Sequence, residues 1–82
     1  MQKRERQNKW VRVQSSAVRE ARYRAREKKL DLIYSDEDCP YEYYDMPRSK
    51  FRALMQADSK GQFVNKEIKP KFSYRKLPPG KS

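Results

Sequence analysis

Three tyrosines within four residues offer the clearest binding chemistry in this sequence. Tyr41, Tyr43 and Tyr44 flank Glu42 in a short run that is typical of a β-strand. Exposed aromatic rings can stack on nucleic-acid bases, each stack being worth ~1–3 kcal/mol. Because side chains alternate along a strand, Tyr41 and Tyr43 share one face and Tyr44 lies on the other. Tyr41 and Tyr43 are therefore either part of a stacking platform or core residues beneath a helix, and Tyr44 is the candidate for a nucleic-acid contact.

Three arginines form the first basic candidate. Arg22, Arg24 and Arg26 recur at every second position. In a strand they would point outward as a basic stripe with a spacing of roughly 6.6–6.8 Å. This is close to the spacing of phosphates along a nucleic-acid strand, and a guanidinium group binds phosphate through two hydrogen bonds. The alternative is an ordinary solvated polar face.

A second basic cluster lies near the end of the sequence and is interleaved with the rings of Phe72 and Tyr74. Positive charge for the phosphate backbone, mixed with rings for the bases, suits single-stranded RNA. The alternative is a basic, partly disordered tail. The members of this cluster are Lys66, Lys69, Lys71, Arg75 and Lys76.

Charge is divided unevenly along a chain whose formal net charge is +10. Residues 1–29 hold 11 basic and 3 acidic residues, residues 30–47 hold 6 acidic and no basic residues, and residues 48–82 hold 10 basic and 2 acidic residues. Basic flanks around an acidic centre can direct a polyanion to particular faces. The acidic run Asp36, Glu37 and Asp38 also provides an alternative site, suited to a protein partner of mixed charge.

Several classes of site find no support in the composition. The sequence has no histidine and one cysteine, Cys39, which excludes an internal disulfide framework and a multi-cysteine metal site. Only two glycines are present, too few for a glycine-rich phosphate loop. We therefore expect neither an enzyme nor a cofactor, a metal site or a small-molecule substrate. No apolar run approaches the ~20 residues that cross a bilayer, so we expect no membrane partner and a cytoplasmic location.

The elements that position these residues follow from periodicity. Residues 10–13, 30–34 and 41–44 alternate as strands. Residues 17–29 are ambiguous, because alanines at four-residue spacing and high helix propensity favour a helix, whereas a period of two places Ala21, Tyr23 and Ala25 inward in a strand. Local signals leave both alternatives open.

A helical region follows the third tyrosine. Pro47 suits the first turn of a helix whose residues 51, 54 and 55 face the sheet. Gly61 is predicted to end this helix in the left-handed conformation, with a further helical turn or two before Pro70. We expect residues 1–9 to form a flexible basic arm, residues 10–77 to form one small domain and residues 78–82 to form a tail.

The order of these residues resembles the KTSC domain. This family is named for the C-terminal region of some lysyl-tRNA synthetases and also includes small single-domain bacterial and phage proteins. The resemblance covers about residues 10–77 and centres on a Tyr-x-Tyr motif, here Tyr41 and Tyr43. It also rests on the ordered spacing of Ser15, Ser16, Tyr23, Leu30, Leu32, Met46, Pro47, Phe51, Leu54, Ala57, Ser59, Gly61, Phe63, Asn65, Ile68 and Phe72.

The resemblance implies an α+β fold and an RNA-binding role. The implied fold is a small antiparallel meander of about three to four strands, followed by one or two helices packed on one face, with residues 18–26 as a strand. The segment Asp36-Glu37-Asp38-Cys39-Pro40, with its three acidic residues, departs from the short turn expected before the Tyr-x-Tyr strand. Their charge would repel phosphate from that edge.

Together these features predict a small, non-enzymatic nucleic-acid-binding module that prefers RNA and has low sequence specificity. The predicted contacts are the three arginines, Tyr44 and the second basic cluster. The alternative function is a protein-interaction adaptor or inhibitor, phage-encoded or ribosome-associated, that uses residues 36–38.

Overall fold

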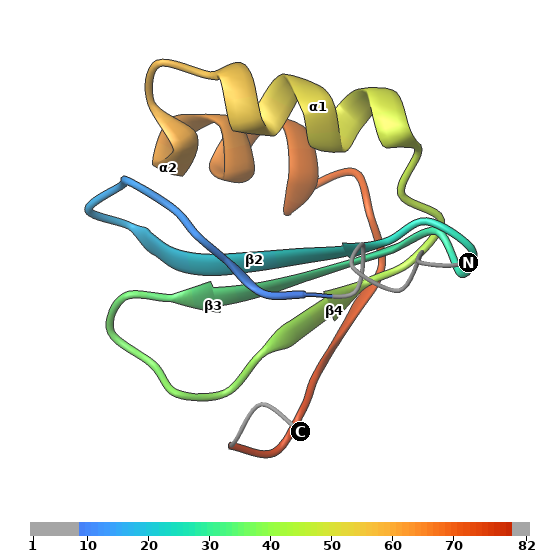
Figure 1. Cartoon of the computed structure of the whole chain (residues 1–82), viewed down its shortest axis with the longest axis horizontal. Coiled ribbons are helices and arrows are strands. Elements are labelled where there is room, and N and C mark those ends of the chain that lie inside the picture. Colours follow the sequence, from blue (N-terminus) through green and yellow to red (C-terminus); the bar gives the residue numbers. More distant parts are fainter. Residues whose placement is uncertain (1–8, 80–82) are drawn as a thin grey trace, which may run out of the picture.

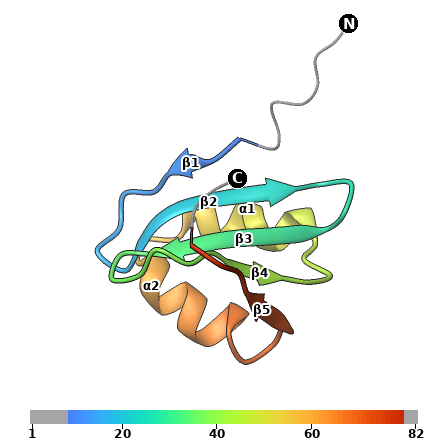
Figure 2. The ribbon, with the colours of Figure 1, turned by 90° about the horizontal axis from the view of Figure 1, so that it is seen from below.

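Within the part of the chain that the structure describes, residues 9–79, five antiparallel strands form one sheet and a helical layer covers one of its faces (Figures 1 and 2). This computed structural model confirms the predicted α+β fold. The strands pair in chain order, and the short strands at the two edges bring their number above the predicted three to four. The elements are β1 (Val11–Arg12), β2 (Val18–Arg24), β3 (Lys29–Tyr34), β4 (Tyr41–Tyr43), α1 (Arg48–Gln56), α2 (Lys60–Phe63), the π-helix η2 (Val64–Ile68) and β5 (Tyr74–Lys76).

The ambiguous segment is a strand, and the helical alternative for residues 17–29 is wrong. Ala21 of β2 is fully buried and pairs with Leu32 of β3. Burial of this apolar face against the helices outweighs local helix propensity, which is a weak preference. The strand ends at Arg24 rather than at residue 26, because a turn follows in which Lys28 has a positive φ of 54°.

The core lies between the sheet and the helices. Leu30, Leu32 and Tyr43 contribute from the sheet, and Leu54 and Ile68 contribute from the helical layer. Phe51 of α1 stacks on Tyr23 of β2, with ring centroids 5.0 Å apart and planes 11° apart. The Tyr23 hydroxyl donates a hydrogen bond of 2.7 Å to the Met46 carbonyl, which fixes the chain where it leaves the sheet for α1.

Gly61 does not end α1, contrary to the sequence prediction. The first helix ends at Gln56, and Ala57 follows it with an ordinary φ of −67°. Ser59 begins the next helix, its hydroxyl accepting a hydrogen bond from the Gln62 backbone N–H. Gly61 lies inside α2, where an added Cβ would stand 2.9 Å from the Cβ of Ala17. Glycine is needed here for the close approach of α2 to the start of β2.

The face of the sheet opposite the helices carries a row of charges across four strands. Arg22, Asp31, Glu42 and Arg75 are direct cross-strand neighbours in that order. Asp31 is fully buried and accepts hydrogen bonds of 2.9 Å from both Arg22 Nε and Arg24 Nη2. Arg24 also donates to Glu42 and thereby joins the two carboxylates. We call these five residues the charge row.

Interactions within the charge row compensate for the burial of its carboxylates. Burial alone would raise the pKa of the Glu42 carboxyl, but the hydrogen bond from Arg24, with Tyr44 and the charge of Lys29, holds this pKa below its ordinary value. The indole of Trp10 covers the Arg22 guanidinium, whose carbon lies 4.6 Å from the ring centroid. Buried charges are tolerated only when they are paired and hydrogen-bonded in this way.

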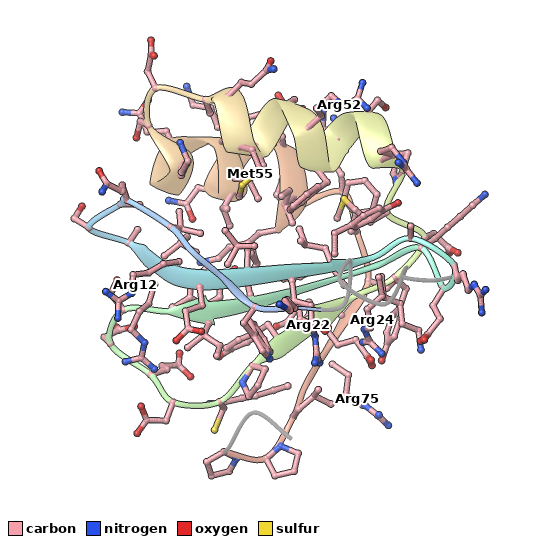
Figure 3. All side chains as sticks on the ribbon, in the orientation of Figure 1. Arg12, Arg22, Arg24, Arg52, Met55 and Arg75 are labelled. Carbon is pink, nitrogen blue, oxygen red and sulfur yellow. The ribbon has the colours of Figure 1, made fainter. Side chains whose placement is uncertain are left out.

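Arg22, Arg24 and Arg26 do not form the predicted solvent-facing stripe. The side chains of Arg22 and Arg24 are only 18% and 17% exposed, because they are paired with carboxylates on the neighbouring strands. Arg26 is exposed, but it lies beyond β2 in the turn. Figure 3 shows Arg22 and Arg24 on the side of the sheet away from the helices. A contact of these arginines with nucleic acid stays a prediction, and two of the three guanidinium groups already have carboxylate partners.

Replacing Asp31 by asparagine should destabilise the fold strongly. Asp31→Asn keeps the size of the side chain but leaves two largely buried guanidinium groups without their shared carboxylate. Breaking a buried ion pair from one side costs about 3–5 kcal/mol. Urea unfolding followed by circular dichroism should show a loss of that order. Asp58→Asn, at an exposed position, serves as the control, and an equally small loss for both variants would contradict the role given to Asp31.

Replacing Gly61 by alanine should destabilise the fold through its contact with Ala17. Helix propensity favours alanine by about 1 kcal/mol, so a net loss would show that the clash outweighs this gain. In the double variant Ala17→Gly/Gly61→Ala the opposing methyl group is absent, and the added Cβ has room. A double-mutant cycle of unfolding free energies should therefore give a favourable coupling of about 1 kcal/mol. Additive effects of the two substitutions on the unfolding free energy would show that the side chains at these two positions are not in steric contact.

Candidate functional site

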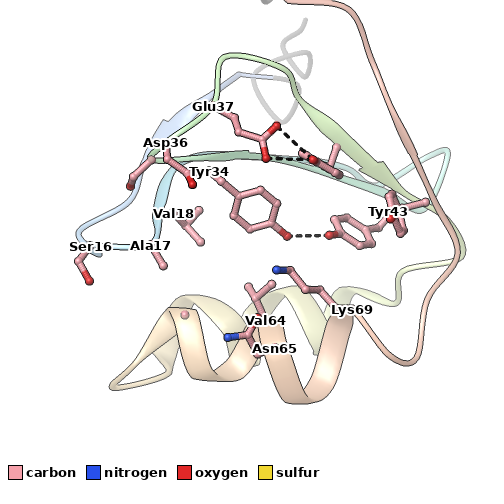
Figure 4. A pocket seen from close by; sticks show the side chains of 14 residues that line it. Ser16, Ala17, Val18, Tyr34, Asp36, Glu37, Tyr43, Val64, Asn65 and Lys69 are labelled. Atoms are coloured by element: carbon pink, nitrogen blue, oxygen red, sulfur yellow. Dashed lines mark hydrogen bonds between the residues drawn. The ribbon is translucent and has the colours of Figure 1, made fainter.

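A cavity of about 630 Å³ opens between one end of the sheet and the helices α2 and η2 (Figure 4). It is bounded by the beginning of β2, the end of β3 with the loop that follows, and the strands β4 and β5. The helical wall carries Gly61, Val64, Asn65 and Lys69. The remaining lining residues are Ser16, Ala17, Val18, Tyr34, Ser35, Asp36, Glu37, Tyr41, Tyr43 and Tyr74. We call this feature the tyrosine cavity.

Four tyrosines from three strands meet at this cavity. Tyr43 pairs directly with Tyr74 of β5, and Tyr41 follows on the same face of β4 because of strand alternation. The ring of Tyr41 lies 5.1 Å from that of Tyr34 and 5.6 Å from that of Tyr74, centroid to centroid. The side chain of Tyr43 is fully buried and belongs to the core, whereas Tyr74 is 53% exposed. Tyr74 therefore presents the open aromatic surface of the group.

Two of the tyrosine hydroxyl groups meet inside the cavity. The hydroxyl oxygens of Tyr34 and Tyr43 are 2.6 Å apart, and either can be the donor (Figure 4). Burial raises the pKa of both phenols above the ordinary value, so both keep their protons at neutral pH. The pair uses one of its two hydroxyl hydrogens. The second hydrogen remains available to an acceptor on a bound molecule.

The rim combines Lys69 with a linked group of three side chains. Lys69 Nζ lies 5.0 Å from the ring centroid of Tyr34. The Tyr41 hydroxyl donates to the Glu37 carboxylate at 3.0 and 3.1 Å, and Lys76 Nζ lies 3.0 Å from the same carboxylate. The hydrogen bond from Lys76, followed by that from Tyr41, lowers the pKa of Glu37. Glu37 thus holds the ring of Tyr41 and the ammonium of Lys76 at the mouth of the cavity.

The second basic cluster is divided between the two faces of the sheet. Lys69 lines the tyrosine cavity and Lys76 lies beside it, whereas Arg75 points to the opposite face, 3.8 Å from Glu42. Lys71 pairs with Glu67 at 3.0 Å. Lys66 is exposed on η2. The structure therefore brings two of the five predicted lysines and arginines to the cavity.

Tyr44 and the acidic run also occupy separate places. Tyr44 lies on the same face as the charge row, where Lys29 Nζ is 5.5 Å from its ring centroid. Asp38 pairs with Arg19 at 3.3 Å, Glu37 is held by Lys76, and Asp36 lines the cavity. The residues predicted for a protein-binding patch therefore do not form one open acidic surface.

Sequence reasoning did not identify Tyr34, Ser16 and Asn65 as site residues. Each is separated from Tyr41 in sequence, and pairing of β3 with β4 is what brings Tyr34 close to Tyr41. The sequence signal that could have identified Tyr34 is the alternation of side chains between the two faces of a strand. Tyr34, Tyr41 and Tyr43 fall on the same face in the predicted strands, and the predicted helix before Pro70 carries Asn65 and Lys69.

Two other kinds of feature are absent from the described part of the chain. Residues 9–79 contain no group of three or more His, Cys, Asp or Glu side chains placed to hold a metal ion. No helix within this range is long and apolar enough to cross a membrane.

Similar proteins share both the sequence pattern and the fold. The profile of the KTSC domain matches residues 14–72. A protein of Tsukamurella paurometabola is 40% identical over 60 residues, which is 73% of this chain and 88% of that protein. A lysine–tRNA ligase of Trichormus variabilis is 34% identical over 67 residues, covering 82% of this chain but only 12% of the ligase.

A crystal structure extends the likeness to three dimensions. A KTSC domain protein from Yersinia pestis superposes with a TM-score of 0.80 at 30% identity, over 85% of this chain and 97% of that one. Several positions that carry the sequence resemblance, among them Ser16, Tyr41, Tyr43, Gly61 and Asn65, line the tyrosine cavity. The chain belongs to the KTSC domain family.

Proposed function

We propose that this domain binds single-stranded RNA and holds one unpaired nucleotide at the tyrosine cavity. The observation that carries the proposal is the convergence of Tyr34, Tyr41 and Tyr74 with Lys69 and Lys76 at one opening. Rings for bases and ammonium groups for phosphates are the two components of single-strand recognition. The binding is non-enzymatic and has low sequence specificity, because stacking tolerates every base.

The size and lining of the cavity suit a nucleotide. Ligand sites typically measure about 300–1,000 Å³, and the volume of about 630 Å³ lies within this range. The exposed ring of Tyr74 offers a stacking surface, and the free hydroxyl hydrogen of the Tyr34–Tyr43 pair can donate to a base carbonyl. Asn65 on the helical wall has both a donor and an acceptor for a base edge.

Charged side chains around the opening determine on which side of the cavity the RNA backbone lies. Asp36 lies on the rim, in the β3–β4 loop, and would repel phosphate there. Lys69 lies on the helical wall of the cavity, where it attracts phosphate. In the proposed complex one phosphate of the RNA lies beside Lys69, and the base enters toward Tyr74.

The family relationship points the same way. One relative that contains a matching segment is named lysine–tRNA ligase, a protein whose substrate is an RNA. A domain that contacts single-stranded RNA weakly and without strict sequence preference fits both an appendage of such an enzyme and a small separate protein. An RNA ligand also fits a cytoplasmic location.

The alternative role as a protein-interaction adaptor draws less support from the contacts. In its acidic run the Glu37 carboxylate is held by Lys76 and Tyr41, and the exposed Asp38 lies 3.3 Å from Arg19. An adaptor that used Glu37 would have to displace Lys76 and Tyr41 from its carboxylate. We therefore keep RNA as the proposed ligand of the cavity.

Fluorescence anisotropy with a labelled, unstructured RNA oligonucleotide tests the proposal. Tyr74→Leu should weaken binding about tenfold, because a stacked base contributes ~1–3 kcal/mol. Tyr44→Leu is the matched control on the opposite face and should have little effect. Lys69→Gln should weaken binding and lower the slope of log affinity against log salt by about one, as expected when one phosphate contact is lost.

Two results would contradict this site. Affinity that barely changes with salt would exclude a phosphate-based interaction. A loss with Tyr44→Leu but not with Tyr74→Leu would move the RNA to the charge-row face. Circular dichroism of each variant verifies that the fold is retained.

A further inference from the structure

A second concave surface lies on the other side of the helical layer, between α1 and the β1–β2 edge of the sheet. It encloses about 320 Å³ and shares no lining residue with the tyrosine cavity. Its floor is formed by Val11, Tyr23, Phe51 and Met55, and its rim carries Lys9, Arg48 and Arg52. We call this feature the edge groove.

Two side chains of the edge-groove floor are held in place by contacts within the domain, and another part of the floor is open to solvent. Tyr23 and Phe51 stack on each other, and the Tyr23 hydroxyl is fixed by the Met46 carbonyl. Val11 is 49% exposed, one of the two large apolar side chains in the described residues that are left this open. An apolar side chain of a partner would find a preformed surface here.

The basic side chains of the rim form no ion pair within residues 9–79 that would stabilise the fold. Lys9, Arg48 and Arg52 have no ion-pair partner among residues 9–79, and no acidic side chain lines the groove. Arg48 is the first residue of α1, where a cation opposes the helix dipole, and Arg52 stands one helical turn further with the same charge. This arrangement weakens the isolated helix and suits an anionic ligand.

The shape of the floor distinguishes between anionic ligands. A nucleic-acid base needs the open face of a ring, but Tyr23 and Phe51 turn one face of each ring toward the other, and Tyr23 is nearly buried. The most exposed side chain of the floor is the aliphatic Val11, whereas Phe51 and Met55 are partly buried. Residues 1–8 of the chain carry Lys3, Arg4 and Arg6 against one acid, Glu5, so this segment does not complement the basic rim.

We propose that the edge groove docks an acidic peptide segment of a partner protein, with one apolar side chain inserted between Val11 and Met55. Acidic residues on both sides of that side chain pair with Lys9 on the strand side and with Arg48 and Arg52 on the helix side. The domain then has two separate surfaces, with the protein partner bound on the face away from the tyrosine cavity.

Two labelled peptides test this docking site by fluorescence anisotropy. The first has the sequence Ser-Asp-Glu-Leu-Glu-Asp-Ser, and the second has serine in place of leucine. The leucine peptide should bind about tenfold more tightly, because its side chain leaves water for the floor. Arg48→Glu/Arg52→Glu should weaken it by about tenfold or more through lost charge complementarity.

A matched variant controls for net charge. Lys28→Glu/Lys66→Glu changes the charge of the protein by the same amount at exposed positions away from the groove, and binding should stay within about twofold. Equal affinity for the two peptides, or an equal loss in both double variants, would overturn the proposal. Circular dichroism establishes that each variant is folded.

The other occupants are also distinguished. If Arg48→Glu/Arg52→Glu weakened binding of unstructured RNA as strongly as binding of the leucine peptide, the groove would be a nucleic-acid surface and the proposal would fail. If sedimentation showed self-association of the wild type that this variant abolished, the occupant would be a second copy of the chain, and the proposal would again fail.

Discussion

The sharing of Asp31 and Glu42 by Arg24 is the interaction on which the rest of this structure depends. Within residues 9–79 no helix covers one face of the sheet, yet both carboxylates are buried there. Moving strand β3 by one residue against its neighbours would turn Asp31 toward the apolar core. The charge row therefore strongly destabilises a wrong register, even though a buried ion pair adds little net stability to the correct one. Correct register is also what places the tyrosines.

The position of the tyrosine cavity follows from that register. With Asp31 beside Glu42, and Glu42 beside Arg75, strand alternation puts Tyr41, Tyr43 and Tyr74 together on the helix side. The close contact of Gly61 with Ala17 then fixes the start of the helical wall against the same strands. The two faces of the sheet therefore differ in role. The charge row fixes the register of the strands, and the helix side provides the proposed binding surface.

The fold could be predicted from the sequence more fully than the site. Alternation at residues 30–34 and 41–44 and the apolar spacing in α1 are local signals, and the structure has these elements. The choice of strand for β2 needed the family resemblance, because its alanines and arginines favour a helix locally. Gly61 was misplaced since a glycine after a helix usually ends it, and only the packing against Ala17 reveals its actual role.

The basic stripe shows why charges are hard to interpret in a sequence. Arg22 and Arg24 have the spacing of a phosphate-binding surface, but their partners Asp31 and Glu42 lie on other strands. Which carboxylate stands opposite which arginine depends on register, and register is a long-range property. The tyrosines were easier to assign to a face of the sheet, because the alternation of side chains within one strand is a local property. The convergence of Tyr34 and Tyr74 on Tyr41 depends instead on how the strands pair.

In the proposed complex the helix side of the sheet, and not the charge row, receives the RNA. Backbone amide shifts of the labelled protein, recorded by nuclear magnetic resonance during titration with an unstructured RNA oligonucleotide, test it most directly. The largest shifts should occur at Gly61, Asn65, Lys69 and Tyr74, with little change at Arg22 and Asp31. Shifts confined to the strands around Asp31 would contradict it.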